Sequence, residues 1–469
     1  MTKIKFGTDG WRAIIAKDFT VENVARVTIA TAEWIINNNK TKKVVVGHDC
    51  RFAGELFADT VSKVFAAKGI HVLLAKGFVS TPMVSLGTKK YGASIGVILT
   101  ASHNPPAYNG FKLKSENGGP LSPVKVQEIE DIIPENNSID LESISLEELI
   151  QIGKVEIIPL EDDYIQHVEK NFDLPSIRNS KLRFAFDAMY GAGQRVVPRL
   201  LPGTQLLHCI HNPTFKGQAP EPIHKNLIEF SDMIRNSQNI DCGLATDGDA
   251  DRIGLYNSRG EFIDSHHIIL LLIHYLVKYK GLKAKVVTAF STTPRVKIMC
   301  DHYGLDSEVV KIGFKYIADI MVEQDILLGG EESGGIAITG HIPERDGIWM
   351  GLVIWEFMAK SGKTLDELIE EVYAITGKFA FERNDLHLKE DLKQRIIDQM
   401  QNGGWDKFGP FTVRNVESID GTKYYFDNNE WVMIRPSGTE PVLRVYAESS
   451  TQEGAFRILE EVKKVILGC

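Results

Sequence analysis

The stretch Val44-Val45-Val46-Gly47-His48-Asp49 decides the fold class of this 469-residue chain. A run of β-branched residues that ends in small and polar ones predicts a buried strand followed by a loop. The next residues predict a helix over 56–67 and another strand over 70–74. The stretches LRFAFD at 182–187 and VVTAFS at 286–291 have the same form, and each precedes another predicted helix. Strands that alternate with helices indicate an α/β protein, and the recurrence indicates three similar α/β units.

The C-terminal part has a different pattern. Thr364-Leu365-Asp366-Glu367 is a capping box, which opens a helix. Residues 423–426 and 431–434 predict a hairpin, and a strand over 442–447 and a helix from 451 follow. This order indicates a smaller α+β domain. We expect boundaries near residues 153, 262 and 375, which divide the chain into domains 1–153, 154–262, 263–375 and 376–469.

Composition and charge narrow the class of protein. Hydrophobic residues make up 43% of the chain and charged residues 25%, as in a soluble globular protein. The net charge of −9 argues against nonspecific binding to nucleic acid. The five cysteines form no CxxC pair, which argues against a zinc site or a disulfide framework and favours reduced thiols. The N-terminus lacks the apolar core of a signal peptide, and the apolar stretch 268–277 is too short to span a bilayer, so we expect a cytoplasmic protein without a membrane partner.

The strongest local motif is Asp247-Gly248-Asp249-Ala250-Asp251-Arg252. Carboxylates at alternate positions of an extended loop can converge on one hard cation. The EF-hand pattern fails, because Arg252 stands at its sixth position and Ser258 at its twelfth. A magnesium ion that keeps coordination sites open for water or a phosphate oxygen suits Asp247, Asp249 and Asp251 better. A solvated turn is the alternative that the motif alone leaves open.

Two further loops offer groups that suit a phosphosugar. The loop GGEESGG at 329–335 is not a P-loop, because it has no lysine, and not a nucleophile elbow, because Glu331 replaces the first glycine. Its acidic and hydroxyl groups suit sugar hydroxyls, although a plain loop fits equally well. The loop RPSGTEP at 435–441 combines a guanidinium, two hydroxyls and backbone amides, which together make a phosphate cradle, and Arg444 follows closely. A connecting turn is the alternative there.

The loop TASHNPPAYNG at 100–110 follows a run, 93–99, that predicts a buried strand. One serine beside a histidine and two adjacent prolines would suit a nucleophile held in a stiff loop. No group within the loop explains how the Ser102 hydroxyl would be activated, so a simple turn fits it at least as well.

Taken together, the loops at 100–105, 247–252, 330–334 and 435–441 resemble the α-D-phosphohexomutases, in which such motifs occur in this order. That superfamily includes phosphoglucomutases, phosphomannomutases and phosphoglucosamine mutases, and the resemblance covers nearly the whole chain. It implies an α/β fold of four domains around a central cleft. Three would be similar α/β domains with mixed sheets, and the fourth would be a smaller C-terminal TBP-like α+β domain.

The resemblance also implies roles for individual residues. Ser102 would carry a phosphoryl group and would join Asp247, Asp249 and Asp251 as a ligand of Mg2+. Residues that would hold the sugar hydroxyls are Glu331 and Ser333. Residues that would lie near the reacting phosphate are Arg12, His103, Lys112 and Arg252. Residues that would clamp the other phosphate are Arg435, Ser437, Gly438 and Thr439, and Arg345 and Arg444 are further substrate-binding candidates.

Three residues are candidates for the general acid/base that moves the proton of the sugar hydroxyl. Lys315 matches a lysine proposed for this role in the phosphoglucomutase branch, and His103 directly follows Ser102. Some family members have a histidine where this chain has Gly335, so a role of that histidine does not transfer. His341 lies nearby in sequence and is the third candidate.

The implied reaction moves phosphate between O1 and O6 of a hexose through phospho-Ser102 and a hexose 1,6-bisphosphate, which serves as intermediate and activator. Thr100 and Glu332 favour glucose or mannose phosphates. The same residues would serve a glucose-1,6-bisphosphate synthase that releases the intermediate and uses a donor such as fructose 1,6-bisphosphate. A non-catalytic phosphosugar-binding protein is the remaining alternative, and the sequence is compatible with a monomer or a homodimer.

Overall fold

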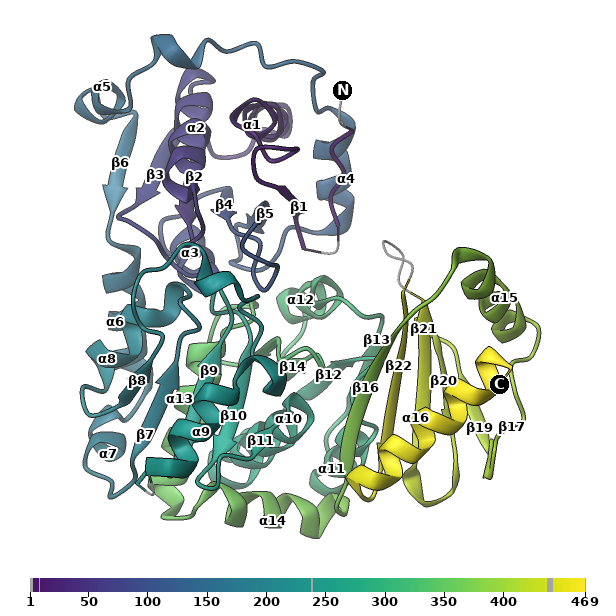
Figure 1. The fold of residues 1–469 in the computed structure, drawn as a ribbon. Helices are drawn as coiled ribbons and strands as arrows, with labels where there is room; N and C mark the ends of the chain where they lie inside the picture. Colours follow the sequence, from purple (N-terminus) through teal and green to yellow (C-terminus); the bar gives the residue numbers. More distant parts are fainter. Residues whose placement is uncertain (1–2, 8, 238, 437–441, 469) are drawn as a thin grey trace. The chain divides into compact units, whose positions relative to one another are not determined.

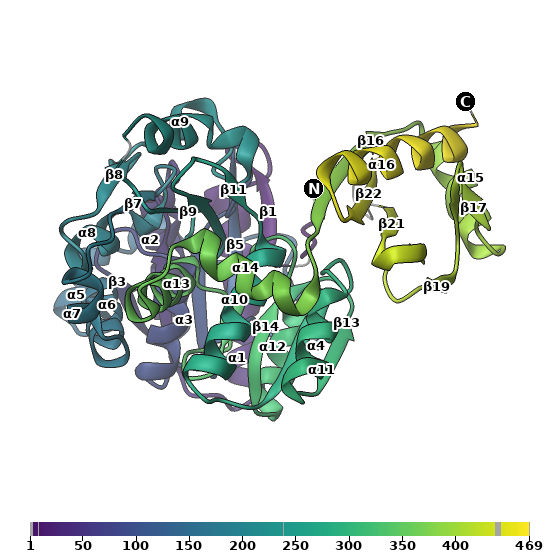
Figure 2. The same ribbon diagram turned by 90° about the horizontal axis from the view of Figure 1, so that it is seen from below.

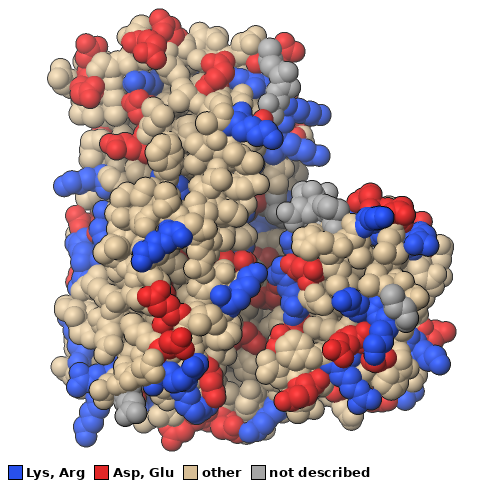
Figure 3. Space-filling model, viewed as in Figure 1, with Lys and Arg blue, Asp and Glu red and all other residues tan. Residues whose placement is uncertain are grey.

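The computed structural model describes residues 3–7, 9–237, 239–436 and 442–468, and its elements are labelled in Figure 1. The chain divides into two compact units, Met1–Val287 with Gly313–Ile369 and Thr288–Ile312 with Glu370–Cys469. The divisions at 287 and 369 fall inside strand β12 (Lys285–Ala289) and helix α14 (Leu365–Thr376). Among the described residues, no helix has the length and apolar character needed to cross a membrane. Acidic and basic side chains are interspersed on the face shown in Figure 3.

The first domain is built on a six-stranded mixed sheet in the order β1-β5-β4-β2-β3-β6. β2 pairs in parallel with β3 and β4, β3 pairs in parallel with β6, and β5 is antiparallel to both β4 and β1. The strands are β1 (Trp11–Ile14), β2 (Lys43–His48), β3 (His71–Ala75), β4 (Ile95–Leu99), β5 (Tyr108–Ser115) and β6 (Val155–Ile158). β6 therefore extends this sheet beyond residue 153.

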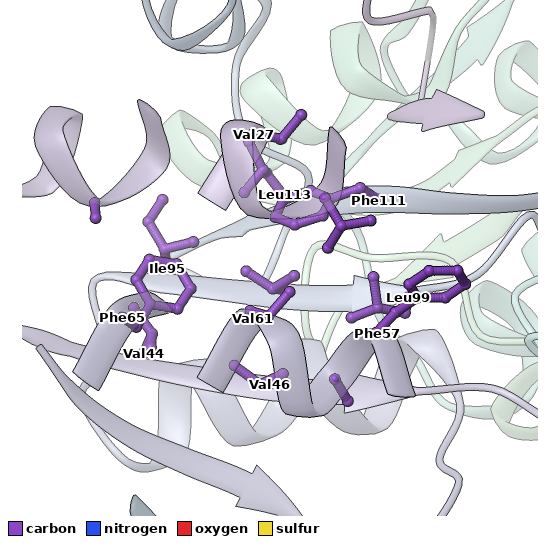
Figure 4. Packing of buried hydrophobic residues seen from close by; sticks show 14 of the residues in the cluster. Val27, Val44, Val46, Phe57, Val61, Phe65, Ile95, Leu99, Phe111 and Leu113 are labelled. Carbon is purple, nitrogen blue, oxygen red and sulfur yellow. The ribbon is translucent and has the colours of Figure 1, made fainter. Parts of the chain in front are cut away.

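The core of this domain explains why the predicted strand and helix form. Phe57, Val61 and Phe65 are spaced by four residues and therefore lie on one face of helix α2, which Figure 4 shows directed at Val44 and Val46 of β2. All five side chains are buried, and each contributes about 1.5–3 kcal/mol relative to an exposed position. The strand and the helix predicted here are confirmed. The helices of this domain are α1 (Val21–Asn37), α2 (Gly54–Ala67), α3 (Thr81–Lys90), α4 (Pro123–Asp131) and α5 (Leu146–Gln151).

The second domain has a five-stranded mixed sheet in the order β11-β10-β9-β7-β8. β7 is parallel to β8 and β9, whereas β10 returns antiparallel to β9, so the aspartate motif is the loop at the carboxyl end of β9. The strands are β7 (Phe184–Asp187), β8 (Gln205–Leu207), β9 (Cys242–Thr246), β10 (Ile253–Asn257) and β11 (Phe262–Ile263). The α-helices are α6 (Leu160–Asn171), α7 (Leu174–Arg178), α8 (Val196–Leu200) and α9 (Ile228–Ser237).

The remainder of the first unit carries the predicted sugar loop as the turn of hairpin β14–β15. Its elements are α10 (Ser265–His274), the π-helical turn Tyr275–Tyr279, α12 (Phe314–Glu323), β14 (Ile326–Gly330), β15 (Ile336–Ile338) and α13 (Gly347–Ser361). All residues of α10 are buried, which accounts for the apolar run from residue 268 as part of a protein core. The capping box is confirmed, because the Thr364 amide donates to Glu367 Oε2 over 2.8 Å and the Glu367 amide donates to Thr364 Oγ1 over 3.3 Å.

The second unit contains an antiparallel sheet in the order β16-β22-β21-β20-β19, and helix α16 (Gln452–Leu467) lies against β22 and β16 (Figure 2). The strands are β16 (Ala380–His387), β19 (Asn415–Glu417), β20 (Thr422–Tyr425), β21 (Trp431–Pro436) and β22 (Val442–Ser449), and a small hairpin joins β17 (Lys407–Phe408) to β18 (Phe411–Thr412). The unit also contains α11 (Arg295–Tyr303), β13 (Ser307–Val310) and α15 (Glu390–Gln401). The predicted hairpin is confirmed as β20–β21, whose turn places Asn428 and Asn429 at φ values of 60° and 59°, which asparagine tolerates.

Candidate active site

Ser102 and the aspartate motif meet in the first unit, although 145 residues separate Ser102 from Asp247. The Ser102 hydroxyl donates to Oδ2 of Asp247 over 2.6 Å, and both side chains are buried. Ser102 lies in the loop after β4, and Asp247 lies in the loop after β9. Ligands of α/β proteins bind beyond the carboxyl ends of such strands. The predicted nucleophile and the predicted metal loop therefore share one site.

The aspartate loop is shaped by its own backbone. The amides of Asp251 and Arg252 donate to Oδ1 of Asp247 over 2.9 and 3.1 Å, which leaves Oδ2 for Ser102. Gly248 permits the close approach of the two loops, because a β-carbon there would lie 2.5 Å from the carbonyl oxygen of Ser102. One carboxylate oxygen from each of Asp247, Asp249 and Asp251 lies within 4.8 Å of the others.

These three carboxylates fit a hard divalent cation. Among the described residues, the Oδ1 atoms of Asp249 and Asp251 are buried without a hydrogen-bond partner, a costly state that a cation would relieve. Burial and the two neighbouring carboxylates raise the pKa of Asp247 well above its usual range. Burial would also raise the pKa of Asp249, but Lys112, Thr81 and Arg345 together outweigh it and hold that pKa below the usual range. Magnesium prefers carboxylate oxygens of this kind, so the side chains present match the predicted ligand set.

Lys112 lies at the centre of a charged cluster beside the aspartates. Its ammonium group is 2.8 Å from Asp9 Oδ2, 2.8 Å from Asp249 Oδ2 and 3.1 Å from Asp251 Oδ2. Burial would lower the pKa of Lys112, but the three carboxylates raise it above its usual value. Lys112 is therefore a fixed positive charge rather than a proton donor or acceptor.

Asp9 is a member of this cluster that sequence reasoning missed. It accepts an ion-pair contact from Arg345 Nη2 at 2.6 Å, and the same nitrogen lies 2.7 Å from Asp251 Oδ2. Burial would raise the pKa of Asp9, but Arg345 and Lys112 hold it well below its usual range. The available signal was its position three residues before Arg12, whose Nη1 donates to Asn104 Oδ1 in the serine loop over 2.8 Å. Asp9 thus joins the N-terminal segment to the metal loop.

The three acid/base candidates occupy different surroundings. Nδ1 of His103 is 3.3 Å from the Ser102 hydroxyl, and burial, assisted by Arg252 and Arg12, lowers the pKa of His103 well below its usual value. These surroundings favour the neutral form of His103, whose Nδ1 lies close to the Ser102 hydroxyl. Lys315, in the first turn of α12, lines a cavity of about 150 Å3 together with Asp9.

His341 lies in a different, buried cluster. Its Nε2 is 3.0 Å from Asp346 Oδ2, its ring stacks on Trp349 at 3.8 Å, and its Nδ1 is 3.2 Å from His167 Nε2. Within the described part of the chain, these contacts join His341 to α6 and α13, and none joins it to Ser102. The geometry supports packing for His341 rather than proton transfer at the serine.

The sugar loop connects directly to the metal loop. The amide of Ile253 donates to the carbonyl of Gly334 over 3.2 Å. In this loop, Glu331 Oε1 accepts a hydrogen bond from the Gly313 amide over 3.0 Å, and Ser333 is half-buried. Burial raises the pKa of Glu331 to about 7, although Arg345 opposes the shift. Glu331 is therefore a buried acceptor beside the metal site.

Gly335 makes room for Arg345. A β-carbon at residue 335 would lie 2.4 Å from Cδ of Arg345, so any side chain there would displace this arginine. The absence of a histidine at 335 is thus linked to the presence of Arg345, whose guanidinium reaches Asp9 and Asp251. Arg252, at the other side of the metal loop, lies 3.6 Å from Glu221 Oε1.

The predicted phosphate clamp belongs to the second unit. Arg435, near the end of β21, contacts Asp420 through Nε at 3.0 Å and Nη2 at 3.2 Å. Arg444 lies directly opposite Arg435 in the antiparallel β21–β22 pairing. The two arginine side chains therefore extend from the same face of the sheet. Three predicted clamp residues, Ser437, Gly438 and Thr439, lie outside the described residues.

Comparison with known proteins identifies the class to which these domains belong. Residues 3–140, 162–260 and 264–375 match the phosphoglucomutase/phosphomannomutase alpha/beta/alpha domains I, II and III, and residues 384–465 match the C-terminal domain of the same proteins. The chain therefore belongs to the phosphoglucomutase/phosphomannomutase family of the α-D-phosphohexomutases. The predicted four-domain α/β architecture is confirmed.

Individual relatives are similar over their whole length. A phosphoglucosamine mutase of Methanocaldococcus jannaschii is 31% identical, with 98% of each chain covered. A phosphoglucomutase/phosphomannomutase of Thermococcus kodakarensis is 29% identical, with 97% of this chain and 96% of the relative covered. A solved structure of a proposed phosphomannomutase from Thermus thermophilus aligns with a TM-score of 0.87 and 31% identity, with 99% of each chain covered. The chain is a phosphohexomutase-family enzyme, and these relatives differ in the sugar that they are named for.

Proposed function

We propose that this enzyme interconverts a hexose 1-phosphate and the hexose 6-phosphate through phospho-Ser102 and a hexose 1,6-bisphosphate. One observation carries the proposal: the buried Ser102 hydroxyl lies 2.6 Å from Asp247 Oδ2, at a cluster of three carboxylates with unsatisfied oxygens. A phosphoryl group on Ser102 needs positive charge nearby, and Lys112 and Arg345 bind the same carboxylates.

Each half-reaction is an in-line phosphoryl transfer. In the first, the bond between phosphorus and Ser102 Oγ breaks, a sugar hydroxyl oxygen bonds to phosphorus, and the hydroxyl proton passes to a base. In the second, Ser102 Oγ bonds to the phosphorus of the other phosphate and gives its proton to a base, while the bond between that phosphorus and the sugar oxygen breaks and the sugar oxygen takes a proton back. Nδ1 of His103, 3.3 Å away, is our candidate for this base, and it would return the proton when Oγ leaves. Lys315 is our candidate for the sugar hydroxyl.

A bound Mg2+ would be held by Asp247, Asp249 and Asp251 with Ser102 and would offset charge on the phosphoryl oxygens. Glu331 and Ser333 would hold sugar hydroxyls, and Arg435 and Arg444 would bind the phosphate that is not reacting. We assign glucose or mannose as the sugar, because Thr100 and Glu332 stand where phosphoglucosamine enzymes often have serine and glutamine. The relatives named as phosphoglucosamine mutases make the hexosamine phosphate the competing substrate.

A substrate panel tests this proposal. The purified protein, with Mg2+ and catalytic glucose 1,6-bisphosphate, is given the 1-phosphates of glucose, mannose and glucosamine, and the products are identified by NMR. We expect the 6-phosphate of glucose or mannose as the main product, and preferred turnover of glucosamine 1-phosphate would overturn the sugar assignment. In a second arm, glucose 1-phosphate is supplied with fructose 1,6-bisphosphate. Accumulation of glucose 1,6-bisphosphate as the dominant product would identify a synthase instead of a mutase.

A further inference from the structure

Ser102 has an unusual backbone conformation. Its φ of 52° lies in the left-handed region, which residues other than glycine and asparagine rarely adopt. Such a conformation persists only where the surroundings hold it, and it is frequent at reactive residues. The adjacent prolines at 105 and 106 stiffen the turn that follows Ser102, whereas its own peptide groups are held by side chains from elsewhere. Other groups must therefore hold this serine in place.

The first of these groups is the side chain of Thr100. Its Oγ1 accepts a hydrogen bond from the Ser102 amide over 2.9 Å and donates one to Asp49 Oδ2 over 2.5 Å. Asp49 directly follows β2, so it projects from the strand beside β4. Its other oxygen, Oδ1, accepts from the Arg51 amide over 2.9 Å. The carboxylate of Asp49 thus joins Thr100 to the turn that carries Arg51.

The second group is the guanidinium of Arg51, which binds the serine loop through its carbonyls. Nη2 donates to the carbonyls of Ser102 and Asn104, each over 2.6 Å. Nη1 donates to the carbonyls of Pro105 and Tyr108, each over 3.0 Å. Arg51 is 3% exposed, and only a planar fork of donors can serve four acceptors at once, so lysine cannot replace it.

A residue of the second domain, Phe215, also contacts Arg51. The ring of Phe215, itself buried, lies over the Arg51 guanidinium at 5.0 Å, and Nε of Arg51 is 3.4 Å from Asp49 Oδ2. The amide of Ser102 is therefore held through Thr100, and its carbonyl is held through Arg51. Thr100 and Arg51 both contact the same buried carboxylate, that of Asp49.

We propose that Asp49, Arg51 and Thr100 are positioning residues that hold Ser102 Oγ at the point of phosphoryl transfer. Together they are called the serine bracket. Its role in catalysis rests on the proposed function, because it acts only through Ser102. Its members are buried, and Thr100 and Arg51 bind the backbone of the serine loop. An in-line transfer is sensitive to the position of the attacking oxygen, so loosening the bracket lowers the transfer rate without weakening substrate binding.

The test compares two substitutions at Thr100. Thr100→Val keeps the shape of the side chain but removes the acceptor for the Ser102 amide and the donor to Asp49, whereas Thr100→Ser retains both. Thr28→Val is the matched control, since Thr28 is equally buried and donates only to a carbonyl within α1. The gain of phosphate by dephosphorylated protein mixed with glucose 1,6-bisphosphate is followed by intact-protein mass spectrometry. We expect Thr100→Val to slow this step by roughly 10–100-fold with KM within about twofold, while Thr100→Ser stays within about threefold of the parent.

Amide hydrogen exchange of residues 99–110 gives a readout that does not depend on catalysis. We expect faster exchange of these residues in Thr100→Val than in Thr28→Val. If the parent protein never gains phosphate but Thr100→Val still speeds exchange of the loop, the proposed function fails and the bracket stands. Equal exchange in Thr100→Val and Thr28→Val overturns the bracket. Phosphate gain by Thr100→Val at the rate of the parent overturns its role in catalysis.

Discussion

The hydroxyl of Ser102 donates a 2.6 Å hydrogen bond to Asp247, a residue of another domain whose second oxygen is held by two backbone amides of its own loop. This hydrogen bond fixes the position of the serine loop relative to the metal loop in the absence of a ligand. Preorganisation of this kind reduces the rearrangement that phosphoryl transfer requires.

Removing the hydroxyl tests the nucleophile. We expect Ser102→Ala to lower turnover by at least about 10³-fold, because no other group can carry the phosphoryl group between the two sugar oxygens. The variant should also gain no phosphate in intact-mass measurements with glucose 1,6-bisphosphate. Ser62→Ala is the matched control, since Ser62 is a buried serine whose hydroxyl bonds within α2. Undiminished turnover by Ser102→Ala would refute the assignment.

Filling the gap at Gly248 should separate the serine loop from the metal loop. The β-carbon of Gly248→Ala would lie 2.5 Å from the Ser102 carbonyl and 3.0 Å from Cγ of Pro220, so one of the loops must shift. We expect a loss of about 1–3 kcal/mol in the free energy of unfolding, as for other overpacked sites, together with weaker Mg2+ binding by calorimetry. Gly203→Ala, where a β-carbon meets nothing within 4 Å, should change neither quantity. Equal free energies of unfolding and equal Mg2+ affinities in Gly248→Ala and Gly203→Ala would contradict the close approach of the two loops.

Magnesium should stabilise the folded protein. Its binding would satisfy the unpaired Oδ1 atoms of Asp249 and Asp251, and ligand at about 100 times its Kd adds about 2.7 kcal/mol to the free energy of unfolding. We therefore expect Mg2+ to raise the thermal midpoint, and excess EDTA to reverse the increase. Asp251→Asn should reduce the increase, whereas Asp232→Asn, at an exposed ion pair on α9, should retain it. A midpoint that does not respond to Mg2+ in the parent protein would argue against the metal site.

Glu331 should make stability fall as the pH rises. Burial raises its pKa to about 7 from the ordinary 4.5, so between these values the folded protein holds a proton that the unfolded chain has lost. The contribution of Glu331 is thus fully present below pH 4.5 and is lost as the pH rises through 7, a change of roughly 3 kcal/mol. Denaturant titrations at pH 5 and pH 8 should show that Glu331→Gln removes most of this decrease. The same pH dependence in parent and variant would show that Glu331 titrates normally.

The secondary-structure elements that are determined by residues close together in the chain could be predicted from the sequence. The strand over 43–48, the helix after it and the capping box at Thr364 follow from spacing and local hydrogen bonds. The meeting of the Asp247 loop with Ser102 could be inferred only from the family resemblance. The roles of individual site residues stay predictions, although the structure brings most of those in the first unit together.

Contacts between distant residues could not be predicted. The Arg345–Asp9 pair spans 336 positions, and the position of Asp9 three residues before Arg12 does not indicate that Arg345 is its partner. Sequence proximity could not separate an acid/base from a packed loop histidine at His341, which lies near the sugar loop along the chain and stacks on Trp349 in a buried cluster. Asp49 was recognisable as the polar end of a strand, yet its link to Ser102 depends on Thr100 and on the parallel pairing of β2 with β4.

The serine bracket has a consequence for the motion of the ligand. An oxygen whose residue is tied at both its amide and its carbonyl cannot follow a departing sugar, so O1 and O6 must come to it in turn. The bisphosphate then has to leave its first set of contacts and return in the opposite orientation. Escape into solvent competes with this reversal. In the proposed reaction, the residence time of the intermediate would therefore determine how often the enzyme completes a full cycle and how often it loses its phosphate.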